Sequence, residues 1–133
     1  DSNTSLELIQ EYEKTRKIQL SVMEVDGQDI SKYGVITPSE KSNLVASLVE
    51  KPNYRDAPSN LATIGRYILT PDIFDALKVQ STGVGGEIQL TDAINQKAAE
   101  GNVNAVKLRE TRFDCGNVNG YISAIKFMSN LII

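Results

Sequence analysis

An acidic and a basic residue stand side by side at one point of the sequence, Glu50 and Lys51, directly before Pro52. Residues 43–49 carry leucine and valine in a pattern typical of a strand. Proline has no amide hydrogen for a sheet ladder, so the strand has to end there. A carboxylate and an ammonium group are therefore expected at a strand end, where open α/β sheets place their ligands. Taken alone, however, the pattern favours a solvated ion pair over a ligand site.

Three further positions fall where strand patterns break or end. Gly34 interrupts the pattern at 33–36, which marks either a β-bulge or a close approach of a ligand to the backbone. Asn60 could contact a ligand, or it could be a turn residue that opens the strand at 60–69. Asp114 could face the same cleft, or it could cap the last helix.

The absence of histidine limits the chemistry of any site in these residues. It excludes Ser-His-Asp, Cys-His and His-ligated zinc arrangements. Catalysis must then use carboxylates, lysine or arginine, backbone amides, or a metal bound by oxygens. We interpret Glu87 and Asp92 as residues that complement a helix start. Cys115 has no base to activate it, so we expect a buried, small apolar residue.

The elements that position these residues follow from apolar periodicity. Helical spacing is seen at 4–16, where we expect Thr4 as the N-cap and Leu6, Ile9 and Tyr12 as the apolar stripe. Further helices are predicted from 70, at 88–100 and after Asn117, which can cap the last one. Strands are predicted at 18–25, 33–36, 41–50, 60–69, 105–108 and before residue 116. The order predicts an α/β fold with a mixed sheet flanked by helices, in one unit that spans residues 1–133.

Composition narrows the class of partner. The chain has 133 residues and a net charge of -3, which argues against a nucleic-acid surface. No apolar stretch approaches the length of a membrane span. A single cysteine excludes an intrachain disulfide and favours a reducing cytoplasm. The sequence begins at Asp1 and lacks an opening strand, so we expect a processed start or a piece of a longer protein.

Several runs of residues together resemble one family. They occur in the same order and at similar spacing over nearly the whole chain. The runs are Tyr33-Gly34-Val35-Ile36, Val49-Glu50-Lys51-Pro52, Ser59-Asn60-Leu61-Ala62, Glu87-Ile88-Gln89-Leu90-Thr91-Asp92 and Asp114-Cys115-Gly116-Asn117. This set resembles the bacterial UTP–glucose-1-phosphate uridylyltransferases, which are the UDP-glucose pyrophosphorylases of the sugar nucleotidyltransferase superfamily.

The resemblance implies an enzyme that makes UDP-glucose and pyrophosphate from UTP and glucose 1-phosphate. It assigns this chain to the C-terminal, sugar-binding half of a Rossmann-like fold. The family's glycine-rich nucleotide loop and its magnesium-binding strand-end aspartate are not in this sequence. The N-terminal, nucleotide-binding half is therefore expected to be absent, and the chain alone is expected to be inactive.

The resemblance also implies roles for single residues. Glu50 would bind the glucose hydroxyls, and Lys51 would meet the sugar phosphate. Gly34 would bring its backbone against the sugar, and Asn60 would add a sugar contact. Asp114 would help to hold Mg²⁺, the expected cofactor. No residue is expected to act as a covalent catalyst.

Two other classes of function remain open at this point. One is a non-catalytic binding or assembly module, and the other is a sugar nucleotidyltransferase with a different base or sugar. The expected partners are sugar phosphate and nucleotide substrates, without nucleic acid or membrane. We expect either a homo-oligomer or association with a missing N-terminal half.

Overall fold

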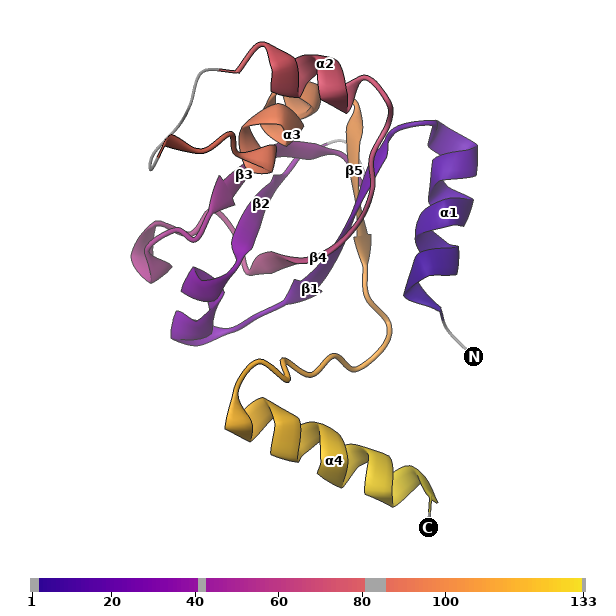
Figure 1. The fold of residues 1–133 in the computed structure, drawn as a ribbon, viewed down its shortest axis with the longest axis vertical. Helices are drawn as coiled ribbons and strands as arrows, with labels where there is room; N and C mark the ends of the chain where they lie inside the picture. The colour runs from indigo at the N-terminus through magenta and orange to yellow at the C-terminus, as the bar shows by residue number, and fades with distance from the viewer. Residues whose placement is uncertain (1–2, 41–42, 81–85, 133) are drawn as a thin grey trace.

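The fold is a curled, mixed sheet with helices on both faces (Figure 1). The computed structural model describes residues 3–40, 43–80 and 86–132. The strand order is β3-β2-β4-β1-β5, in which β1 pairs antiparallel with β4 and parallel with β5. The strands are β1 (Ile18–Glu24), β2 (Gly34–Pro38), β3 (Val45–Glu50), β4 (Leu61–Ile68) and β5 (Val103–Lys107). The predicted α/β class with a mixed sheet is confirmed.

Within the described residues, α-helices and short 3₁₀-helices accompany these strands. They are α1 (Thr4–Thr15), η1 (Gly27–Lys32), η2 (Tyr54–Asp56), α2 (Ile73–Lys78), α3 (Leu90–Ala99) and α4 (Val118–Ile132). The predicted elements therefore exist, with one exception. We expected a strand before residue 116, but residues 108–117 form an irregular link between β5 and α4.

The interior strand β1, between β4 and β5, is buried on both faces. Alternate residues of a strand point to opposite faces. Ile18, Leu20 and Val22 pack into the main core with apolar residues of α2 and α3. The Gln19 side chain points the other way, and its Nε2 donates to Thr15 Oγ1 of α1 at 2.8 Å. Helices on both faces thus explain why the polar residues Gln19 and Ser21 of this strand are buried as completely as its apolar ones.

Helix α1 turns a different face to the sheet from the one we predicted. Thr4 is not the N-cap, because Asn3 Oδ1 accepts the Leu6 N–H at 3.2 Å. Thr4 and Leu8 are the buried residues of this helix. Leu6 is 52% exposed and Ile9 is 46% exposed. The helix therefore packs on the sheet through Thr4 and Leu8, which are four residues apart. Its more apolar stripe, with Leu6 and Ile9, faces solvent.

The two edge strands of the sheet approach each other because the sheet curls. Leu44 and Asn104 form an isolated antiparallel bridge between the start of β3 and β5. The Ala105 N–H also donates to the Asn43 carbonyl at 2.8 Å. This curl encloses the main core and tilts β3 toward α3.

An asparagine of α3 fixes that helix against β3. Asn95 Oδ1 accepts the Leu48 N–H at 2.6 Å, and its Nδ2 donates to the Leu48 carbonyl at 2.7 Å. The backbone N–H and carbonyl of Leu48, on the edge strand β3, are therefore both hydrogen-bonded by one side chain. The first turn of α3 consequently lies over the end of β3, where Glu50 is found.

Helix α4 stands apart from this body (Figure 1). The structure shows no extensive packing between α4 and the other described helices or strands. A ring contact joins Phe113 of the link to Phe127 in the second half of α4, with centroids 5.2 Å apart. None of the described helices has the length and apolar character needed to cross a membrane.

A mostly buried lysine connects α2 and α3 through two carboxylates. Lys97 Nζ lies 2.8 Å from Asp72 Oδ2 and 3.2 Å from Glu100 Oε2. The hydrogen bond from Lys97 lowers the pKa of Asp72, and the hydrogen bonds to Asp72 and Glu100 raise the pKa of Lys97. A carboxyl with a depressed folded-state pKa adds stability above its unfolded pKa and loses it as the pH falls through the folded value.

We therefore expect an Asp72→Asn variant to lose less thermal stability than the parent when the pH falls below about 4. The effect is modest because the Asp72 side chain is half exposed and solvent screens the pair. Thermal unfolding over a pH series measures it. Asp75→Asn is the matched control, because the Asp75–Lys78 pair is fully at the surface. Identical acid sensitivity in both variants would show that the buried lysine adds nothing.

Candidate functional site

The register of β2 against β3 places Gly34 directly opposite Glu50. The two residues predicted for the sugar are therefore neighbours on paired strands. The ladder is regular at this point, and its irregularity lies between Thr37 and Pro38. The β-bulge that we considered for Gly34 is wrong.

Gly34 is buried, and its lack of a side chain leaves room for its neighbours. A β-carbon at this position would lie 2.9 Å from Thr63 Oγ1 and 3.2 Å from Glu50 Oε2. It would also lie 3.3 Å from Leu48 Cδ1. Thr63 Oγ1 donates to the Gly34 carbonyl at 3.3 Å, which keeps this threonine against the glycine. Glycine is thus the residue that lets the Glu50 carboxylate stand over the strand.

The Glu50 carboxylate is held by one contact from α3. Thr91 Oγ1 donates to Glu50 Oε2 at 3.2 Å. Thr91 lies in the first turn of α3, where the helix dipole favours a negative charge. Within the described ranges, no hydrogen bond is made to Glu50 Oε1. The carboxylate is therefore oriented through one oxygen, and the other oxygen can accept hydrogen bonds from a ligand.

Lys51 has an unusual backbone conformation. Its φ is 44°, in the left-handed region that non-glycine residues rarely adopt. The preceding strand pairing holds it, because the Lys51 N–H donates to the Tyr33 carbonyl at 3.1 Å. Pro52 follows and is buried. The structure contains no Glu50–Lys51 ion pair, so the ion-pair interpretation does not explain these two residues. A strained, exposed lysine at a strand end is instead typical of a binding site.

Asn60 lies just before β4 and farther from this group. Its carbonyl accepts the Val25 N–H at 2.9 Å. Thr63, which contacts Gly34, follows Asn60 by three residues. Asn60 is therefore about 10 Å from Thr63 along the chain. The structure brings Gly34, Glu50 and Lys51 together but records no contact between Asn60 and any of them.

Asp114 lies in the link, exposed, within a tight turn. Its Oδ1 accepts the Gly116 N–H at 3.0 Å, and its carbonyl accepts Asn117 Nδ2 at 3.2 Å. Asn117 Oδ1 accepts the Gly120 N–H at 2.9 Å, so Asn117 caps α4 as predicted. A β-carbon on Gly120 would overlap the Asp114 carbonyl. The turn therefore sets the position of Asp114 relative to α4.

Two contacts place the link beside Tyr33, which directly precedes the site glycine. Arg112 Nη1 donates to Tyr33 Oη at 3.4 Å, and the guanidinium lies 5.6 Å from the ring centroid. The charge of Asp114 also contributes to a raised pKa of Lys32, after the larger effect of the hydrogen bond to Asp29. Asp114 thus lies on the side of the molecule that carries Gly34. No group of three or more metal-ligating side chains occurs in the described ranges.

The other residues that the sequence analysis singled out lie outside the group of Gly34, Glu50 and Lys51. Asp92 lies in the first turn of α3, as expected, and Glu87 is exposed ahead of it. Cys115 is exposed, so our expectation that it is buried is wrong. It lies in the link, which no sheet or helix covers. The predicted glycine-rich loop at 80–86 falls largely outside the described residues.

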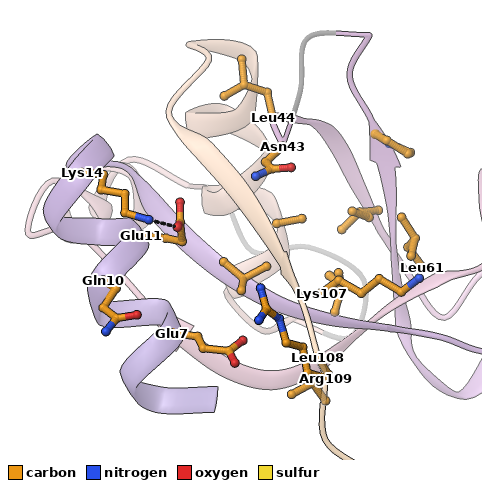
Figure 2. A pocket seen from close by; sticks show the side chains of 15 residues that line it. Glu7, Gln10, Glu11, Lys14, Asn43, Leu44, Leu61, Lys107, Leu108 and Arg109 are labelled. Atoms are coloured by element: carbon orange, nitrogen blue, oxygen red, sulfur yellow. Dashed lines mark hydrogen bonds and ion pairs between the residues drawn. The ribbon is translucent and has the colours of Figure 1, made fainter. Parts of the chain in front are cut away.

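A groove occurs elsewhere, between α1 and β5 (Figure 2). Its volume is about 740 Å³. Its wall includes Glu7, Glu11 and Lys14 of α1, with Lys14 Nζ 2.6 Å from Glu11 Oε1. None of the five predicted site residues lines it. This groove is therefore separate from the residues that the strand ends indicate.

Two residues that contact the predicted site residues were missed from the sequence, Thr63 beside Gly34 and Thr91 beside Glu50. Thr91 belongs to the run 87–92 that carries the family resemblance, and this was the signal in the sequence that could have singled it out. Thr63 gave no such signal, because its position beside Gly34 follows from the pairing of Val35 with Ala62.

Replacing Gly34 by alanine is expected to lower the free energy of unfolding by about 1–2 kcal/mol, because the β-carbon overpacks this site. It should also displace the Glu50 carboxylate. Thr63→Ala removes the atom that the new β-carbon would approach most closely. Chemical denaturation of both single variants and the double variant measures the coupling. Additive losses would mean that Gly34 and Thr63 do not compete for this space.

The chain can now be compared with known proteins. The family model described as "Nucleotidyl transferase" matches residues 3–130. A UTP–glucose-1-phosphate uridylyltransferase of Pseudomonas aeruginosa is 48% identical over 124 residues, which are 91% of this chain and 44% of that protein. One of Streptococcus pyogenes is 44% identical over 120 residues, which are 87% of this chain and 40% of that protein.

A solved structure of a UDP-glucose pyrophosphorylase complexed with UDP-glucose has a TM-score of 0.87 and 40% identity to this chain. The match covers 98% of this chain and 51% of that one. The chain thus spans about half the length of its relatives. The family model covers almost the whole chain, and the TM-score shows that the chain shares the fold of the matched part of that solved structure. The chain belongs to the nucleotidyl transferase family.

Proposed function

We propose that this chain forms the sugar-binding part of a UTP–glucose-1-phosphate uridylyltransferase. The observation that carries the proposal is the pairing of Gly34 with Glu50, next to Lys51 in a left-handed conformation. The relatives at 44–48% identity support the choice of reaction. The whole of residues 1–133 would then be one unit of a larger catalytic domain.

Each residue of the group suits one part of glucose 1-phosphate. The Glu50 carboxylate accepts hydrogen bonds from sugar hydroxyls while Thr91 holds its other oxygen. Gly34 leaves the sugar ring free access to the strand. The Lys51 ammonium meets the phosphate as a point charge on a flexible stem. Asn60 contributes at the margin of the sugar.

The proposed reaction is an in-line displacement. A phosphate oxygen of glucose 1-phosphate attacks the α-phosphorus of UTP, the bond from that phosphorus to the bridging oxygen breaks, and pyrophosphate leaves with the electron pair. The protein positions the reactants and neutralises charge, without a covalent intermediate. Glu50 and Lys51 fix the attacking phosphate by its sugar and by its charge.

Asp114 is the described residue that best suits Mg²⁺. Its carboxylate is exposed, uses one oxygen for the Gly116 N–H and lies on the same side as Tyr33. Mg²⁺ is usually bound by one or two carboxylates together with phosphate oxygens and water, so a single aspartate fits this chemistry. When bound, the ion would offset negative charge on the phosphates. The single cysteine of the chain also fits a cytoplasmic enzyme.

The test is a titration of the ¹⁵N-labelled chain with glucose 1-phosphate. We expect the amide signals of Gly34, Glu50 and Lys51 to shift together, and those of the α1 groove to stay in place. Galactose 1-phosphate serves as the matched ligand with one inverted hydroxyl. A site for another sugar would respond more strongly to galactose 1-phosphate. A non-catalytic assembly module would leave all three signals unchanged, which would refute the proposal.

A further inference from the structure

Tyr33 supports two parts of the proposed site at once. Its carbonyl accepts the Lys51 N–H at 3.1 Å, and its own N–H donates to the Ile30 carbonyl at 3.2 Å. Its side chain packs against the small core cluster that contains Ile30 and Val35. Gly34 follows it directly at the start of β2. Because both its backbone and its side chain are held, Tyr33 is a fixed point for any group that rests on it.

Arg112 of the link rests on Tyr33. Its Nη1 donates to Tyr33 Oη at 3.4 Å, and its guanidinium carbon lies 5.6 Å from the ring centroid. A planar guanidinium can donate a hydrogen bond and also lie against an aromatic ring, whereas the ammonium group of lysine acts as a point charge. The two contacts involve the same pair of side chains, so they fix both the distance and the orientation of Arg112 on the ring.

The link is attached to the rest of the molecule at few places before it reaches α4. Thr4 Oγ1 of α1 donates to Glu110 Oε2 at 3.1 Å. In the described ranges, the recorded hydrogen bonds of residues 113–120 stay within the link and α4. The contacts of Arg112 with Tyr33 are therefore the last ones recorded between the link and the strands before the chain enters α4.

Asp114 follows Arg112 by two residues, so their Cα atoms are at most about 7 Å apart. Its turn is closed on itself, because Asp114 Oδ1 accepts the Gly116 N–H at 3.0 Å. We infer that Arg112 is a positioning residue. Its contact with Tyr33 fixes Asp114 relative to the strand end that carries Lys51. The inference rests on the proposed function, in which a carboxylate for Mg²⁺ and an ammonium group for the phosphate must act on the same reactant.

The first test needs no ligand and uses the one natural thiol of the chain. Cys115 is exposed, and a nitroxide label on it would be attached three residues from Arg112, at most about 11 Å along the chain. We expect this label to broaden the amide signals of Tyr33 and Gly34 in the ¹⁵N-labelled chain. Arg112→Met removes both contacts and should reduce this broadening about two-fold or more, because the link is then free to move away. The broadening at Tyr121 should stay the same, since the turn before α4 is intact.

Three further variants complete this test. Arg109→Met is the matched control, because Arg109 is an exposed arginine of the same link with no recorded contact to Tyr33 in the described ranges. It should leave the broadening as in the parent chain. Arg112→Lys keeps the charge without the planar group, and Tyr33→Phe keeps the ring without the hydroxyl, so each should retain part of the broadening. Equal broadening in the parent and in Arg112→Met would overturn the inference.

The second test asks whether this position of Asp114 affects the reaction. The protein is a fusion that carries the unmatched half of the Pseudomonas aeruginosa relative before Asp1, assayed for pyrophosphate release. Arg112→Met should lower kcat about ten-fold or more, because a small misplacement of a charged group is costly in catalysis by positioning. The KM for glucose 1-phosphate should change by less than about two-fold, because Glu50 and Lys51 are unaltered. A general loss of folded protein would not change the Mg²⁺ concentration that gives half of the maximal rate, whereas we expect Arg112→Met to raise it.

The two tests separate this inference from the proposed function. A parent fusion that releases no pyrophosphate would refute the proposed reaction, and the broadening in the chain would still decide whether Arg112 holds the link. Reduced broadening together with an unchanged kcat would show that the reaction does not depend on where Arg112 holds Asp114, and would overturn its positioning role.

Discussion

The purified 133-residue chain is expected to release no pyrophosphate from UTP and glucose 1-phosphate, even with Mg²⁺ present. Its residues suit the sugar side of the reaction, but the sequence contains no glycine-rich loop of the type that holds UTP phosphates in the resembled family. Catalysis by positioning requires both reactants to be fixed together. An advantage of roughly 7–11 kcal/mol is lost when one of them is not held.

The same assay on a fusion that carries the unmatched half of the Pseudomonas aeruginosa relative before Asp1 is the matched control. We expect the fusion to release pyrophosphate with UTP, and a Glu50→Gln fusion to be much slower. Turnover by the 133 residues alone, at a rate near that of the intact Pseudomonas aeruginosa enzyme, would contradict our assignment of this chain to the sugar side.

The second large effect is expected at Lys51. Lys51→Ala should weaken binding of glucose 1-phosphate by about 1.5–3 kcal/mol, because it removes a charge-assisted contact to the phosphate. This corresponds to a loss in affinity of roughly 10-fold to 150-fold. The titration described above measures the change in the chain itself, and kcat/KM measures it in the fusion.

A glycine at the same position separates binding from folding. A left-handed conformation costs an L-residue about 1–2 kcal/mol, and glycine is free of most of that cost. Lys51→Gly should therefore keep or raise the free energy of unfolding, by up to about 1 kcal/mol after the greater flexibility of the unfolded chain is counted. Its affinity for glucose 1-phosphate should fall as in the alanine variant.

Lys32→Ala is the control for a general loss of positive charge, since Lys32 is exposed and pairs with Asp29 at 2.7 Å. It should leave the affinity nearly unchanged. A Lys51→Gly chain that unfolds more easily than the parent and still binds glucose 1-phosphate would assign Lys51 a purely structural role.

Local patterns in the sequence determined the class of fold and the strand end at which we propose the site. Proline at 52 ends β3 because it lacks an amide hydrogen, and this left Glu50 and Lys51 at a strand end. Asn117 caps α4 because its short side chain reaches the first free amides of that helix. Such features depend on a few neighbouring residues, so they can be predicted from the sequence alone.

The tertiary structure decided the features that depend on which surfaces meet. Helix α1 buries Leu8 instead of its more apolar stripe, because the sheet offers only one face to it. Glu50 is oriented by Thr91, and Gly34 is crowded by Thr63, through contacts between residues 41 and 29 positions apart. The exposure of Cys115 and of α4 likewise depends on the packing of whole elements. No local pattern contains that information, because side-chain surroundings are fixed only when distant segments pack together.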